Sequence, residues 1–152
     1  MTADRERDRL GRARNARPRD GLGRPLPRGS ELGTERVPNE LHLSVADAVD
    51  LAQDYLDRSR PFHAHEVLEA LWKTEPSTER DLWQGLAQIA VGLTHALRGN
   101  ATGATALLRR GAGRMKAYVG PEHDIAVAEV IAWAEALATD PTVAPPPLRL
   151  RA

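Results

Sequence analysis

The chain has 152 residues, enough for one domain with a modest core, and its 21 Lys and Arg balance its 21 Asp and Glu. Residues 1–40 hold ten Arg and seven acids, whereas the remainder holds eleven bases and fourteen acids. These figures exclude a strongly basic nucleic-acid-binding body, and the lack of cysteine excludes disulfides, thiolate catalysis and cysteine-ligated metal sites.

No apolar run approaches the roughly 18 residues of a membrane span, and the first residues lack the apolar segment of a signal peptide. We therefore expect a cytoplasmic protein without membrane contact. The segment 1–40 is rich in Arg, Gly and Pro and has no aromatic residue, so it buries too little apolar surface to offset the entropy of ordering. We expect a flexible leader, with an extended path over the body as the alternative. Its Arg residues suit an acidic partner or RNA, but its acids make nucleic acid an unfavourable partner.

Beyond the leader, apolar residues recur at helical spacing in five segments joined by short turns: 44–59, 61–74, 79–98, 101–118 and 124–138. Ser44 is a good N-cap for the first helix, and Pro61 suits the first turn of the second. Ser77 or Thr78 is predicted to cap the third helix. That third helix is the most apolar of the five and is the best candidate for the centre of a bundle.

The fold class that follows is all-α, a single bundle of about five helices over 41–140 with extended N- and C-terminal tails. No segment shows the alternation of a strand, and no repeat recurs at a fixed period. The tail 141–152 is rich in proline and is predicted to be extended.

One stripe of the second predicted helix carries His65, Glu69 and Trp72, with Phe62 beside them. A helix turns about 100° per residue, so Glu69 lies about 40° from His65 and Trp72 about 20° on the other side. His65 and Glu69 are close enough for a hydrogen bond or a shared metal ion, and Trp72 would form an apolar wall. His63 lies about 160° away on the helix and is predicted to be a surface residue.

A second polar stripe, Gln84, Gln88 and His95, follows one side of the third predicted helix. Glycines recur every seven residues along that side. Each glycine costs about 1 kcal/mol inside a helix, so we expect another helix or a ligand to cover this side. Helices joined by a short turn pack antiparallel, which brings the two polar stripes together. The sequence therefore predicts one polar cluster, lined by Phe62, His65, Glu69, Trp72, Gln84, Gln88 and His95.

Three interpretations of this cluster stay open. In the first, it is a ligand or active site without a metal, with His65 as the base and Glu69 as its orienting partner; hydrolysis is then the least specific reaction. In the second, His65, Glu69 and His95 bind a divalent metal, although we expect no cofactor. In the third, a buried polar pair fixes helix register, and the protein is a structural or protein-interaction module. The partner, a small molecule or a protein, and the oligomeric state are not predicted.

Known motifs narrow this choice only slightly. The stretch His-Glu-Val-Leu-Glu, residues 65–69, resembles the first half of a zinc metalloprotease helix, but Glu69 replaces the second histidine. The two Glu-x-x-His pairs of a di-iron bundle are absent from the sequence. The match to either metal-dependent class is therefore poor.

The stretch PFHAHEVLEALWKTEP, followed by WQGLAQIAVGLTHALRGNATGATALLRRG, resembles the bacterial and archaeal helical family known as domain of unknown function 309 (DUF309). His65, Glu69 and Trp72 match the His-x-x-x-Glu-x-x-Trp motif of that family. The resemblance covers about residues 60–119, and the Arg-rich leader and Pro-rich tail resemble actinobacterial versions. It implies an all-helical bundle of unestablished activity, and it lends weight to the His/Glu/Trp trio as a site.

Overall fold

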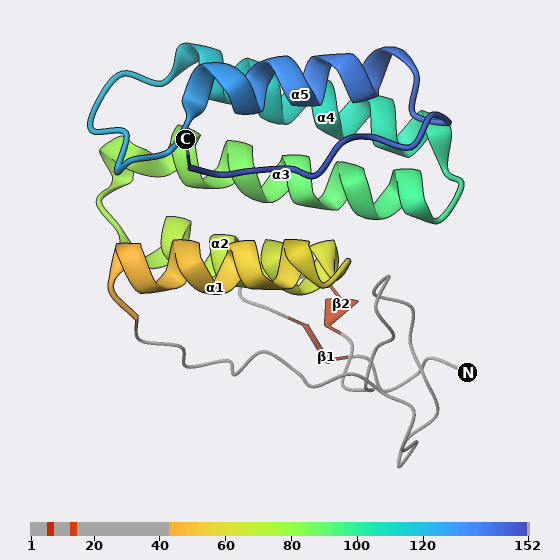
Figure 1. Ribbon diagram of the computed structural model, residues 1–152. Coiled ribbons are helices and arrows are strands. Elements are labelled where there is room, and N and C mark those ends of the chain that lie inside the picture. The colour runs from red at the N-terminus through yellow and green to blue at the C-terminus, as the bar shows by residue number, and fades with distance from the viewer. Residues whose placement is uncertain (1–5, 8–12, 15–42, 152) are drawn as a thin grey trace.

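The computed structural model of the chain describes residues 6–7, 13–14 and 43–151 (Figure 1). Its five α-helices are α1 Val45–Asp57, α2 Pro61–Thr74, α3 Arg80–Leu97, α4 Ala101–Ala117 and α5 Val127–Thr139. The remaining elements are the 3-10 helix η1, Ser77–Glu79, and the antiparallel two-residue strands β1, Glu6–Arg7, and β2, Ala13–Arg14. Each predicted helix matches one observed helix, which confirms the all-α fold class. Strands of two residues are too short for an alternation pattern to reveal. Most of the predicted flexible leader, 1–40, lies outside the described residues.

The five helices form three layers, with α1 and α2 on one side, α3 in the middle, and α4 and α5 on the other side (Figure 1). The middle helix packs against both α2 and α4, while α1 packs on α2 and α5 packs on α4. Its Leu82, Trp83 and Ile89 are fully buried. Burial of each such side chain stabilises the fold by about 1.5–3 kcal/mol. The prediction of a central third helix is confirmed.

Side-chain hydrogen bonds cap the N-termini of α1 and α4. The Ser44 hydroxyl accepts a hydrogen bond from the backbone N–H of Asp47 at 3.1 Å, as predicted. The Asn100 carbonyl oxygen accepts one from the N–H of Gly103 at 3.0 Å and so caps α4. The predicted cap of the third helix by Ser77 or Thr78 is wrong, because η1 continues directly into α3 and no side chain caps either element.

The crossing of α3 and α4 depends on glycine. A Cβ atom built on Gly85 would lie 2.9 Å from the carbonyl oxygen of Gly111, and one built on Gly92 would lie 2.7 Å from Cγ of Leu108. A helix therefore covers the predicted glycine stripe at these two positions. Gly99 has a different role: its φ of 83° is left-handed, no atom lies near it, and it ends α3.

The C-terminal segment runs extended across α3, between α1 and α5 (Figure 1). The proline-rich composition predicted the extended path but not the burial of Leu148 and Leu150, which join the hydrophobic core. None of the described helices is both long enough and apolar enough to pass through a membrane.

Candidate functional site

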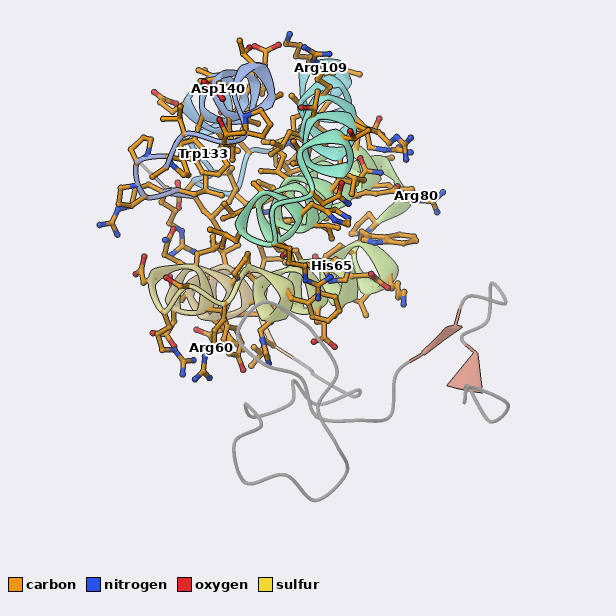
Figure 2. All side chains as sticks on the ribbon, turned by 90° about the vertical axis from the view of Figure 1, so that its right-hand side faces the viewer. Arg60, His65, Arg80, Arg109, Trp133 and Asp140 are labelled. Atoms are coloured by element: carbon orange, nitrogen blue, oxygen red, sulfur yellow. The ribbon has the colours of Figure 1, made fainter. Side chains whose placement is uncertain are left out.

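The predicted trio His65, Glu69 and Trp72 lies on α2, and all three side chains are half-buried. Nε2 of His65 lies 2.8 Å from Oε2 of Glu69, and Nζ of Lys73 lies 2.9 Å from the other carboxylate oxygen. His65, Glu69 and Lys73 are spaced four residues apart, so they follow one another along one side of α2. We call these three residues the ladder. The side chains of His65 and Glu69 are 18% and 21% exposed. Figure 2 looks end-on at the bundle, with His65 in the layer of α1 and α2 and Trp133 on the opposite side.

The ionisation of Glu69 determines which side chain of the His65–Glu69 pair donates the hydrogen bond. The hydrogen bond to His65 lowers the pKa of Glu69 to about 2; burial opposes this, and the charges of His65 and Lys73 reinforce it. The carboxylate is therefore ionised near neutral pH and can only accept hydrogen bonds, so Nε2 of His65 must carry the proton between them. Nδ1 of His65 is buried and has no hydrogen-bond partner among the described residues. In the neutral ring that atom is an acceptor.

Aromatic side chains flank the ladder. The ring of Phe62 lies 5.2 Å from that of His65, centroid to centroid. Trp72 is half-buried and packs against the core, and the guanidinium of Arg80 lies 5.7 Å from its ring. Both aromatic residues thus lie on α2, with a cation close to the Trp72 ring, and their role as an apolar wall stays a prediction.

The polar stripe of α3 is half-buried, but its members do not bond to His65. Since one nitrogen of His65 binds Glu69 and the other has no partner, neither Gln88 nor His95 shares a hydrogen bond with it. A ring nitrogen of His95 lies 3.2 Å from the Asn100 amide nitrogen. Burial, aided by the nearby Arg98 charge, lowers the pKa of His95 and favours its neutral ring. Oε1 of Gln88 is buried and has no hydrogen-bond partner in the described part of the chain.

Gln84 is half-buried on the same stripe. No group of three or more His, Asp or Glu residues within 43–151 is arranged to hold a metal ion, so the proposed set of His65, Glu69 and His95 finds no support as a metal centre. Two hollows of the described surface also lie elsewhere. One is lined by Leu43, α1 and α2, and the other by α1 and the C-terminal segment.

The prediction that His63 lies at the surface is wrong. Its side chain is only 2% exposed, and its ring lies 5.2 Å from that of Tyr55 on α1. The physical reason is that α2 is covered on two flanks, by α3 on one and by α1 on the other. A helical wheel with one buried face places His63 on the exposed side. The short turn between α1 and α2 was a signal that α1 would cover a second side of α2.

A second polar cluster has no counterpart among the predicted sites. Oε1 of Glu79 accepts a hydrogen bond from the indole N–H of Trp83 at 3.1 Å and lies 3.0 Å from Nε2 of His123. The His123 ring also lies 5.4 Å from the Trp83 ring. The spacing of four between Glu79 and Trp83 was a visible signal. Nothing in the spacing pointed to His123, which comes from the loop between α4 and α5.

The comparisons with known proteins concern the region from α1 to the start of α4. Residues 49–107 match the model of the family described as Domain of unknown function (DUF309). The Uncharacterized protein YpuF of Bacillus subtilis (strain 168) is 40% identical over 62 residues, which cover 36% of this chain and 36% of that relative. The match thus spans about a third of the length of the curated relative, and no solved structure matches the chain. The matched region, from within α1 to the start of α4, is therefore similar to the DUF309 family.

Proposed function

We propose that this domain binds a ligand that donates a hydrogen bond to Nδ1 of His65. The observation that carries the proposal is the geometry of the imidazole: Nε2 lies 2.8 Å from the Glu69 carboxylate, and the opposite nitrogen is buried without a partner among the described residues. A buried acceptor without a partner costs about 1–3 kcal/mol. A hydroxyl, amide or ammonium group would remove that cost on binding.

The neighbours of His65 suit such a ligand. Phe62 and Trp72 offer apolar contact surface on α2. Gln88 on α3, the helix packed against α2, also has a buried side-chain oxygen without a hydrogen-bond partner among the described residues. Hydrolysis extends the proposal by one step, because Nδ1 is also the atom at which a general base would take a proton from water.

A structural role is the second candidate, and one observation favours it. His65 and Glu69 bond to each other, and neither of these two hollows of the described surface is lined by them. In that case the pair fixes how α2 sits against α3, and the domain acts as a scaffold or protein-interaction module.

A thermal-shift screen with small amides, alcohols and amines separates these roles. We expect hits to raise the melting temperature of the wild type and of Lys73→Gln, and to leave His65→Phe unchanged. Lys73→Gln is the matched control, since it alters the same ladder but leaves the His65 ring in place. Imidazole ¹⁵N signals provide a second measurement, because a true ligand must shift the signal of His65 Nδ1. A His65→Phe variant that melts far below wild type, with no hit on any variant, supports the scaffold role. A ring protonated on both nitrogens at neutral pH would contradict the acceptor assignment.

A further inference from the structure

The C-terminal segment 146–151 occupies a groove between α1 and α5, on elements that the His65 site does not use. At the start of this segment, the indole N–H of Trp133 on α5 donates a hydrogen bond to the carbonyl oxygen of Pro146 at 2.8 Å. At its end, the backbone N–H of Ala126 donates to the carbonyl oxygen of Leu150 at 2.7 Å. The groove thus holds the segment at both ends through backbone oxygens.

Gln53 of α1 binds the middle of the segment as a neighbouring strand would. Its amide nitrogen donates to the carbonyl oxygen of Leu148 at 3.0 Å, and its amide oxygen accepts from the N–H of Leu150 at 2.8 Å. One side chain therefore satisfies the donor and the acceptor that face it on alternate residues. Ile125 and Arg151 add an isolated antiparallel β-bridge on the other side. Such backbone contacts bind any extended chain and do not depend on its side chains.

Side chains supply the selectivity. Leu148 and Leu150 are 6% and 1% exposed, so alternate side chains of the segment are buried in the hydrophobic core. Arg149 lies 3.5 Å from the carboxylate of Asp57, and Arg151 binds the carboxylate of Asp50. The groove therefore pairs an apolar floor with acids from α1.

We propose that this groove is a peptide-binding site for an extended Leu-Arg-Leu-Arg segment of a partner protein, and that the chain's own residues 146–151 occupy it in competition. The occupant's chemistry follows from the contacts: an extended backbone, two apolar side chains two residues apart, and an arginine after each of them for the acids of α1. Recognition by strand-like backbone bonds with alternate side-chain pockets is the mode that extended peptides use on exposed edges.

The link between α5 and the segment allows such exchange. Val143 and Ala144 are exposed, and the turn before them is closed by local bonds from Thr142 to the Asp140 carboxylate. A segment tethered by so short a link has an effective concentration on the order of millimolar. A partner peptide must therefore compete, and its apparent affinity for the intact chain is reduced.

The test uses the full chain with a protease site inserted between Val143 and Ala144. After cleavage we expect the body to keep its helical circular dichroism, and a fluorescently labelled PPPLRLRA peptide to bind saturably by anisotropy. The uncleaved protein should bind this peptide about tenfold or more weakly. Gln53→Ala should weaken binding to the cleaved protein by about tenfold, because two hydrogen bonds are lost. A peptide with both leucines replaced by serine is the control for specificity.

Three results would overturn the proposal. If the body loses its helical signal on cleavage, the segment is part of the core and not a ligand. If the cleaved segment leaves and labelled peptide does not bind at millimolar concentration, the groove has no affinity of its own. If the cleaved segment stays but never exchanges with labelled peptide, the groove is closed to partners.

Discussion

The ionisation of Glu69 predicts a specific pH dependence of stability. Its pKa falls from an ordinary value of 4.5 to about 2 in the folded protein, chiefly through the hydrogen bond to His65. Because the folded value is the lower one, the carboxylate stabilises the fold fully above pH 4.5, and this contribution is lost as the pH falls from 4.5 toward 2. A shift of this size corresponds to about 3 kcal/mol at most. Since the Glu69 side chain is 21% exposed and Lys73 is exposed, solvent screening reduces the expected value to about 1–2 kcal/mol.

Glu69→Gln isolates this contribution, because it keeps the shape and removes the charge. We expect the variant to be less stable than wild type by about 1–2 kcal/mol at pH 7, and the difference to shrink steadily between pH 4.5 and pH 3. Urea denaturation followed by circular dichroism at pH 7, 5, 4 and 3 measures it. Glu129→Gln, at an exposed carboxylate on α5, serves as the control and should change little at any pH. A stability difference that is constant from pH 7 to pH 3 would refute the assignment of a paired, ionised Glu69.

Two further predictions concern the core. Gly111→Ala should destabilise the fold by about 1–3 kcal/mol, because its Cβ would lie 2.6 Å from the backbone oxygen of Gly85. Gly113→Ala is the control and should stabilise the fold by about 0.5–1 kcal/mol, because a Cβ there would meet nothing within 4 Å. Equal urea midpoints for the two variants would contradict the crossing geometry of α3 and α4. Glu79→Met should lower the free energy of unfolding by about 1–3 kcal/mol, because it leaves the buried Trp83 N–H without an acceptor. Glu79→Gln keeps an acceptor and should lower the free energy of unfolding by less. Chemical denaturation of both variants measures the two losses, and a larger loss for Glu79→Gln would contradict the bond to Trp83.

The elements that local chemistry controls were predictable. Ser44 and Pro61 mark helix starts because an N-cap hydroxyl and a proline in the first turn act within a few residues. The His65–Glu69 bond was likewise predictable, because a spacing of four on a helix determines which side chains meet. The start of α3 was predicted to within one residue, but its cap by Ser77 or Thr78 was wrong, since the 3-10 turn leads into the helix without a side-chain cap.

Contacts that depend on the tertiary arrangement were not predictable from spacing. The burial of His63 requires knowing that α1 covers the outer flank of α2. The bond between Glu79 and His123 spans 44 positions and depends on a loop residue with a φ of 51°. The burial of Leu148 and Leu150 was hidden in a proline-rich composition that is typical of extended tails. In each case the local sequence permits the contact, but another element creates it.

The His65–Glu69 pair also shows why its geometry favours a role beyond helix stability. An exposed pair spaced four apart on a helix contributes about 0.3–0.5 kcal/mol, which a Glu–Lys pair would supply equally well. The pair on α2 instead leaves a buried Nδ1 without a partner, at a cost of about 1–3 kcal/mol that cancels much of what the charged bond contributes. A polar or apolar residue without a second ring nitrogen would avoid that cost while keeping the packing against Phe62. The binding role that we propose would use the unpartnered Nδ1, whereas the bond to Glu69 uses only Nε2.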